Sequence, residues 1–377
     1  MQLTSTSEEL ALGEALRGLL ERHASEDAVR RAMESEVGWE PTLWQRLASD
    51  LGVTGLGIPE GLGGAGGGLR DIGVVMREAG RSLLCAPYLS SIVLGAQTLS
   101  RCGDEAAAKE LLPAVAAGKR RVTLAPFAAD GSWQSDASTV TATGHSGGWR
   151  LSGTRPFVLD GSTAHDLIVP AMIDGEIALF LVDADQDAVS ATPMNVLDQT
   201  RRQAIVELAG AEARQLNVAR GVPQLLSDIH DRGLAALSAE QMGGAEKVLE
   251  QSVQYAKERV QFARPIGSLS AIKHRLADVH VTNEGALSAS MHALECADSE
   301  DHADHEEFPL AAVLAASLAG DAFFAAASEN IQVHGGIGFA WEHPAHLYFR
   351  RAKADQSLFA STREARELVA QRFPGGK

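Results

Sequence analysis

The order in which the hydrophobic pattern changes along the chain limits its fold more than any other feature. The first part places leucines such as Leu12 and Leu16 at helical spacing, the middle part alternates as strands do, and the last part is helical again. Over 377 residues, this order indicates three domains. We predict a helical domain over residues 1–120, a β-domain over 121–215 and a second helical domain over 216–377.

Four segments of the middle part have the alternation of β-strands, with Gly, Asp and Ser residues between them. They cover 140–143, 149–152, 166–170 and 178–182. The helical parts are rich in alanine, which favours helix. The predicted fold class is therefore α+β, with the strands and the helices in separate parts of the chain.

The composition excludes several classes of partner. The formal net charge of −16 argues against a nucleic acid or an anionic membrane as the main partner. The three cysteines, Cys85, Cys102 and Cys296, show neither metal-ligand spacing nor a paired framework, which is typical of a reducing cytoplasm. Residues 1–5 show no leader pattern, and we find no run of about 18 apolar residues. We therefore expect a cytoplasmic protein without membrane insertion.

The acidic segment 298–307 contains two histidines, His302 and His305, which are possible metal ligands. Six acidic residues in ten positions are more typical of a solvated connection between helices. We therefore expect a loop here and predict no metal site.

Two further segments carry candidate binding residues. Between two helical runs, 311–328 and 345–354, lies a stretch with three glycines in four residues, which allows a close approach of the backbone to a ligand. Free N–H groups beside a helix start suit a pyrophosphate. This stretch contains Gln332, Gly335, Gly336 and Gly338. A second segment, 255–267, lies well upstream and contains Arg259 and Phe262.

Together the two segments resemble those of the acyl-CoA dehydrogenase family, and the resemblance covers essentially the whole chain. It implies an N-terminal helical domain, a middle β-domain and a C-terminal four-helix bundle. It also implies FAD as cofactor and the α,β-dehydrogenation of an acyl-CoA thioester, in which a carboxylate removes an α-proton and a hydride leaves the β-carbon. Members are usually tetramers with each flavin at a subunit junction, and an electron-transfer flavoprotein is the implied acceptor.

The resemblance assigns roles to particular residues. Arg259 and Phe262 resemble the residues that hold the FAD of a neighbouring subunit, and the glycine stretch resembles the loop at the adenosine and diphosphate half of the cofactor. In the β-domain, the segment 156–162 lies where the family places a motif beside the flavin ring, so Phe157 and Ser162 are candidates. The alternatives are a surface ion pair of Arg259 with Glu258 or Asp278, core packing of Phe262, and an ordinary β-domain loop.

The catalytic base is where the sequence departs from the family. Phe359, Ala360 and Ser361 fall where members commonly carry a glutamate, and a second position used by some members falls on Gly233. None of these can act as a carboxylate base, so the catalytic residue stays unknown. The nearby carboxylates are expected to be solvated helix charges. They are Asp231, Glu240, Asp355 and Glu364.

Two explanations follow from the missing base. In the first, which we favour, the chain is a subunit of a hetero-tetramer that shares its FAD site with a paralogous subunit carrying the glutamate, similar to bacterial enzymes of steroid or lipid degradation. In the second, a neighbouring carboxylate substitutes in a homo-tetramer. Two other functions keep the same fold, namely a flavin-dependent monooxygenase, which needs no such glutamate, and a non-catalytic scaffold subunit. The acyl group is not readable from the sequence.

Overall fold

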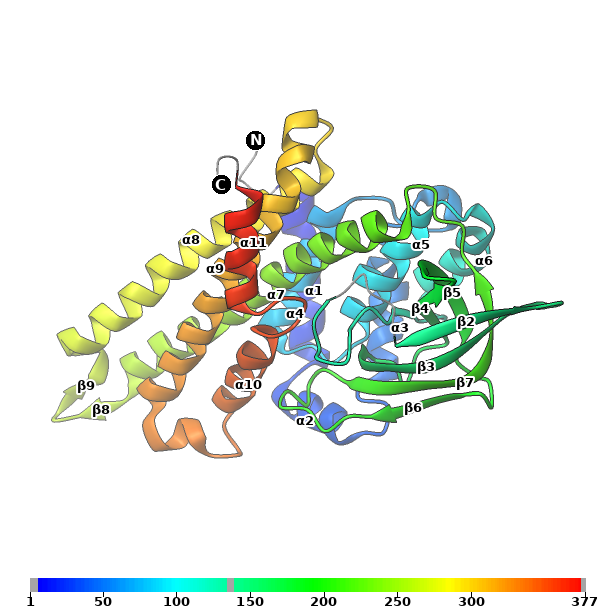
Figure 1. Ribbon diagram of the computed structural model, residues 1–377. Coiled ribbons are helices and arrows are strands. Elements are labelled where there is room, and N and C mark those ends of the chain that lie inside the picture. Colours follow the sequence, from blue (N-terminus) through cyan, green and yellow to red (C-terminus); the bar gives the residue numbers. More distant parts are fainter. Residues whose placement is uncertain (1–5, 134–138, 374–377) are drawn as a thin grey trace. The chain divides into compact units, whose positions relative to one another are not determined.

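The computed structural model describes residues 6–133 and 139–373 (Figure 1). The expectation of no leader rests on residues 1–5, which lie outside this range. Contacts within the chain define two compact units, called the helical unit and the sheet unit below. The helical unit comprises Met1–Arg30, Gly73–Leu84 and Leu234–Lys377, and the sheet unit comprises Arg31–Ile72 and Cys85–Gly233.

The helical unit is built around three long helices. Its helices are α1 (Ser7–His23), the first part of α2 (Glu26–Glu34), the later parts of α4 (Leu69–Ser82) and α7 (Val222–Glu258), then α8 (Ser270–Asp298), α9 (His302–His334), α10 (Ala345–Asp355) and α11 (Thr362–Arg372). Local signals fix several ends. Thr6 and Glu9 form a capping box at α1, and Ser361 and Glu364 form another at α11.

Helices α4 and α7 touch backbone to backbone at two glycines. A Cβ atom on Gly243 would lie 1.8 Å from the carbonyl oxygen of Arg77, and a Cβ atom on Gly80 would lie 1.9 Å from that of Glu240. Both neighbours are main-chain atoms, so no side-chain rotation can make room. The close crossing of these helices therefore depends on the absence of a side chain at both positions.

Replacing Gly243 by alanine should destabilise the protein by about 1–3 kcal/mol, because the added methyl group forces α4 and α7 apart. Helix propensity alone predicts a gain of about 0.5–1 kcal/mol for the same change, so the sign of the effect is diagnostic. Thermal unfolding of the variant measures it. Gly285 is the matched control, because it is also in a helix and a Cβ atom there has nothing within 4 Å. A stabilised Gly243→Ala protein would contradict the close crossing.

Helix α9 is long and apolar. By length and composition alone, the segment His302–Phe339 could cross a membrane, with a mean hydropathy of 1.8 over its most apolar window, and it is the one such helix in the described part of the chain. However, 61% of that window is buried within the protein. The small buried residues of α9 pack against α8, α10 and α11, which accounts for its apolar composition.

The prediction of a loop over residues 298–307 is wrong for most of this segment. Only residues 299–301 connect the helices, because α8 ends at Asp298 and α9 begins at His302. The Asp301 side chain caps α9 by accepting a hydrogen bond from the Ala303 amide at 2.9 Å. The acidic residues that follow therefore lie on the first turns of a helix.

The sheet unit contains a seven-stranded sheet that closes on itself. Its strands are β1 (Val122–Leu124), β2 (Val140–His145), β3 (Gly148–Leu159), β4 (Asp166–Ile173), β5 (Glu176–Asp183), β6 (Val189–Pro193) and β7 (Gln203–Gln215). The strand order is β1-β4-β2-β3-β7-β5, and β5 also pairs with β4, so the ring has no free edge there. Leu151, Leu167 and Phe180 are buried in its core.

Helices α3 (Pro41–Ser49), α5 (Gln97–Cys102) and α6 (Glu105–Ala116) also belong to the sheet unit. The four predicted strands are confirmed as parts of β2, β3, β4 and β5, whereas β1, β6 and β7 were not predicted. The pairing of β3 with β7 shifts register between Arg155 and Val158. Phe157 lies in this irregularity and has a positive φ of 56°.

Candidate functional site

The segment 255–267 folds into a short hairpin that follows α7. Strand β8 (Val260–Gln261) pairs with β9 (Arg264–Pro265), and Phe262 and Ala263 form the two-residue turn with φ values of 52° and 59°. A turn with two positive φ values is normally made by Asn-Gly or Gly-rich pairs. Residues other than glycine are strained in this backbone conformation, and such strained residues are common at binding sites.

Phe262 and Arg259 both project from this hairpin into solvent. The Phe262 side chain is 87% exposed, so core packing within this chain is excluded. Arg259 is exposed too, and among the described residues it makes no ion pair with Glu258 or Asp278. The structure therefore supports neither an ion pair of Arg259 with these two residues nor core packing of Phe262. The assignment of both residues to a flavin stays a prediction.

The glycine stretch forms a 3₁₀ turn, Gly335–Phe339, directly after α9. Gly335 has a φ of 63°, which favours glycine. A Cβ atom on Gly338 would lie 3.0 Å from the Ile331 carbonyl oxygen, so packing within the chain explains that glycine. Gly336 differs, because a Cβ atom there would have nothing within 4 Å and its φ is not positive. Its lack of a side chain has no cause inside this chain. Gln332 is exposed on α9.

Aromatic stacking brings the hairpin and the glycine turn together. The ring of His334 stacks on Tyr255 with centroids 4.2 Å apart and lies 4.5 Å from the ring of His343. Below these rings, Val333 packs in one apolar cluster with Ile266. The sequence analysis did not assign a role to Tyr255, His334 or His343. Their signal was weak, because stacking depends on contacts between residues about 80 positions apart.

Two histidines beside this turn make the helical unit sensitive to acid. Burial lowers the pKa of His343 and His346, with neighbouring positive groups adding to the effect. The folded state therefore binds these protons more weakly than the unfolded state, whose histidines titrate near about 6.5. Stability should be complete above about pH 6.5 and should fall as the pH drops below it.

The His346→Gln variant should show a smaller fall in melting temperature than the parent between about pH 7.5 and about pH 5.5. His302→Gln is the control, because the His302 side chain is 87% exposed. Differential scanning fluorimetry across this range measures both. Equal slopes for the parent and the His346→Gln protein would contradict the argument.

Phe157 and Ser162 belong to the sheet unit, so the structure describes them as a separate group of candidates. Both are half-buried at the end of β3. Between them, the Asp160 carboxylate accepts a hydrogen bond from the Ser90 hydroxyl at 2.5 Å. Burial raises the pKa of Asp160 despite this bond. The group offers main-chain and hydroxyl donors on a rigid strand end.

The positions where the resemblance led us to expect a base are occupied by residues with structural roles. Phe359 is buried and has a φ of 68°, Ala360 follows it, and the Ser361 hydroxyl accepts from the Glu364 amide at 3.2 Å to cap α11. Gly233 lies inside α7. No carboxylate stands at either position.

Only one of the four nearby carboxylates is the solvated helix charge that we expected. Glu364 is exposed, and its side chain caps α11 by accepting from the Ser361 amide at 2.7 Å. The other three are buried: Glu240 pairs with the buried guanidinium of Arg351, Asp231 lies 3.6 Å from His230, and Asp355 is 2% exposed. The expectation failed because charge spacing on a helix does not reveal a buried partner elsewhere.

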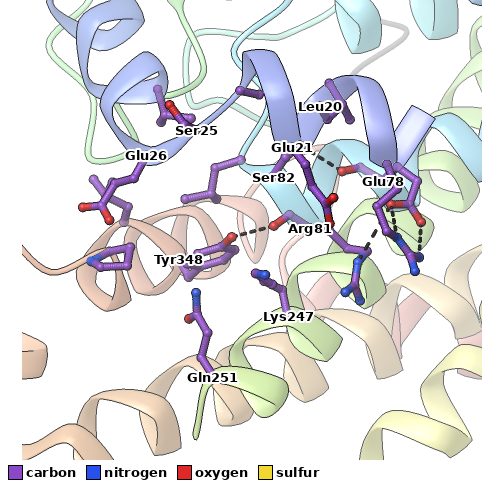
Figure 2. Close-up of a pocket in the computed structure, with 16 residues that line it drawn as sticks. Leu20, Glu21, Ser25, Glu26, Glu78, Arg81, Ser82, Lys247, Gln251 and Tyr348 are labelled. Carbon is purple, nitrogen blue, oxygen red and sulfur yellow. Dashed lines mark hydrogen bonds and ion pairs between the residues drawn. The ribbon is translucent and has the colours of Figure 1, made fainter. Parts of the chain in front are cut away.

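The helical unit also contains a cavity of about 250 Å³, shown in Figure 2. Residues of α1, α4, α7 and α10 line it, and none of the predicted flavin residues is among them. Its charges are largely paired, since Arg17 binds Glu78 at 2.6 Å and Arg81 binds Glu250 at 2.8 Å. The Tyr348 hydroxyl donates to the Arg81 carbonyl oxygen at 2.5 Å, and burial raises the pKa of Tyr348. This arrangement favours packing over chemistry.

Comparisons with known proteins decide the family. Residues 6–119 match the model of the acyl-CoA dehydrogenase N-terminal domain, and residues 220–373 match that of the C-terminal domain. The chain belongs to the acyl-CoA dehydrogenase family. A relative of the same family, acyl-CoA dehydrogenase IpdE2 from Mycobacterium tuberculosis, is 35% identical over 96% of each chain. These matches confirm the predicted family and the enzyme class, an FAD-dependent oxidoreductase.

Solved structures confirm the acyl-CoA dehydrogenase fold. The ChsE4-ChsE5 complex from Mycobacterium tuberculosis contains a chain with a TM-score of 0.87 and 28% identity, and the match covers 98% of each chain. A variant of the Tcur3481-Tcur3483 steroid ACAD has a TM-score of 0.86 and 29% identity, covering 97% of each chain. Both are complexes named for two different components.

The exposed groups of this acyl-CoA dehydrogenase fit a dinucleotide cofactor. Arg259 offers guanidinium donors that no described acidic residue occupies, and Gly336 presents open backbone. Phe262 offers an uncovered ring. Pyrophosphate and flat rings are the groups that such donors, backbone and ring faces bind.

Proposed function

We propose that this chain is one subunit of a heteromeric FAD-dependent acyl-CoA dehydrogenase, and that a paralogous partner subunit supplies the carboxylate base. The observation that carries the proposal is a mismatch within the chain. Flavin-side groups are present and uncommitted, whereas Phe359, Ala360, Ser361 and Gly233 stand where a base is needed. A chain that has the flavin-side groups but no carboxylate base fits a site whose base comes from another subunit.

The buried carboxylates of this chain are poor substitutes. A general base must reach the α-proton of the substrate and exchange protons with it. The Glu240 side chain is held by the Arg351 guanidinium, so it is not free to reach a substrate. Glu364 is committed to the α11 cap. A partner's carboxylate therefore meets the requirement better.

The exposed apolar residues around the flavin candidates favour assembly. Phe262 and Val260 on the hairpin, Ile337 and Phe339 on the glycine turn, and Val281 on α8 are all more than half exposed. Figure 1 shows the hairpin at the end of α8. Exposed large apolar side chains are common at interaction sites. We propose a hetero-tetramer in which a partner covers these residues.

We propose a separate role for each group of candidate residues. Bound FAD would supply the hydride acceptor. Arg259 would bind the cofactor diphosphate as a charged fork, Gly336 would admit it close to the backbone, and Phe262 would cover an aromatic ring. In the sheet unit, Phe157 and Ser162 would lie at the flavin ring and would help to exclude water.

The names of the similar proteins guide the substrate class. One structural relative is named a steroid ACAD, and others carry the names IpdE2 and ChsE4-ChsE5. We propose a bulky, steroid-derived acyl-CoA thioester as the substrate and a cytoplasmic role in steroid degradation. An electron-transfer flavoprotein is the proposed acceptor.

The test compares the chain alone with the chain coexpressed with a paralogous acyl-CoA dehydrogenase subunit that carries the glutamate. We expect little FAD in the chain alone, as a monomer or dimer, and a yellow tetramer when both are present. Anaerobic acyl-CoA should then bleach the flavin absorbance. A homotetramer of this chain alone with one FAD per chain and sustained turnover would overturn the proposal.

A further inference from the structure

Three side chains of different chemistry meet where α8 joins α9, and none of them is a flavin candidate. His292 and Cys296 lie one helical turn apart on α8, and Glu307 lies in the second turn of α9. The Cys296 Sγ atom is 3.6 Å from both ring nitrogens of His292, and the His292 Nε2 atom is 3.2 Å from the Glu307 Oε1 atom. One ligand atom from each residue lies within 4.8 Å of the other two.

These separations match the edges of a small coordination polyhedron. Zinc binds imidazole nitrogen at about 2.0–2.1 Å, carboxylate oxygen at about 2.0–2.2 Å and thiolate sulfur at about 2.3 Å in a tetrahedron. Such bond lengths place the nitrogen about 3.6 Å from the sulfur and about 3.4 Å from the oxygen. The observed distances of 3.6 Å and 3.2 Å are close to these values. The sulfur and the oxygen lie within 4.8 Å of each other, and the half-exposed Glu307 side chain can adjust this separation.

The residues around these three side chains favour the binding of a cation between them. The Cys296 side chain is buried, so its sulfur faces inward rather than into solvent. A second carboxylate, Asp304, lies three residues before Glu307 on α9 and accepts from the Ser299 hydroxyl at 2.9 Å. The segment 298–307 carries six acidic residues and no Lys or Arg, which raises the local cation concentration.

We propose that His292, Cys296 and Glu307 form a zinc site that clamps the start of α9 to the end of α8. A mixed nitrogen, sulfur and oxygen set suits Zn²⁺ better than Mg²⁺ or Ca²⁺, which take oxygen ligands. Asp304 or a water molecule completes the fourth position. Binding releases the Cys296 thiol proton to solvent as the sulfur–metal bond forms, and no redox step is involved. The role is structural and independent of the flavin chemistry.

The test uses the full chain, stripped with a chelator and then titrated with Co²⁺ as a spectroscopic probe. We expect one equivalent to produce a thiolate-to-cobalt charge-transfer band and the visible bands of a tetrahedral ion. Zn²⁺ should displace both. Stoichiometric Co²⁺ without a charge-transfer band would overturn the site.

Three variants define the ligands. Cys296→Ala should abolish the charge-transfer band, and Glu307→Gln should weaken binding at least about tenfold. Glu307 is exposed, so its variant keeps the test valid if Cys296→Ala fails to fold. His305→Gln, an exposed histidine on the same turns, is the control and should bind like the parent. Zinc should also raise the melting temperature of the parent and the control but not that of Glu307→Gln. Equal binding by the parent and Glu307→Gln would overturn the assignment.

Discussion

Replacing Glu240 by glutamine should lower the free energy of unfolding by about 3–5 kcal/mol. The Glu240 and Arg351 side chains are 4% and 2% exposed, and each is drawn from a different helix of the helical unit. Removing the carboxylate charge takes away one charged partner of a guanidinium that is itself buried. Thermal and urea unfolding of the parent and the variant measure the loss. The same effect would explain why Glu240 is unavailable as a base.

The matched control is Glu367→Gln, which breaks the exposed pair of Arg363 and Glu367 on α11. An exposed pair contributes about 0.2–1 kcal/mol, so this variant should unfold almost like the parent. A contrary result for Glu240→Gln would be a protein of normal stability whose turnover with a partner is abolished. That outcome would make Glu240 the catalytic base and would return the homomeric explanation to first place.

Replacing Arg259 by glutamine should weaken FAD binding by about 10–100-fold in the assembled enzyme. The estimate follows from losing one charge-assisted contact to a diphosphate, worth about 1.5–3 kcal/mol. Stability of the isolated chain should not change, because Arg259 is exposed and makes no ion pair among the described residues. Flavin fluorescence during dilution gives the dissociation constant.

Lys257→Gln is the control for this prediction. Lys257 is an exposed cation in the last turn of α7, two residues before Arg259, and removing it changes the net charge by the same amount. A general electrostatic effect would weaken FAD equally in both variants and would remove Arg259 from the proposed site. Retained FAD affinity in Arg259→Gln would do the same.

Much of the fold was predictable because it depends on local periodicity. The strand at 178–182 is confirmed within β5, since its apolar residues face a closed sheet and its turn residues mark the ends. Strand β7 was missed because its 13 residues include a glycine with positive φ and several charges. Pairing with both β3 and β6 stabilises it, and such pairing is not visible in the sequence.

The candidate site divides in the same way. The glycine stretch and the position of Arg259 come from short motifs that one sequence contains in full. The hairpin conformation was not predictable, because Phe262 and Ala263 lack the Asn-Gly signature of that turn. Nor was the environment of Glu240, since its partner Arg351 lies 111 residues further along the chain. Contacts at that distance depend on the complete fold.

The helical unit is assembled from three stretches separated by most of the sheet unit, and this constrains the order of events during synthesis. At about 5–20 residues per second, roughly 200 residues separate Arg30 from Leu234, so α1 waits about 10–40 s before the first residues of the third stretch, within α7, are made. The sheet unit, in contrast, can close while translation continues. Slow decoding between Arg30 and Leu234 would therefore prolong the exposure of α1, and chaperone demand should track that region of the transcript.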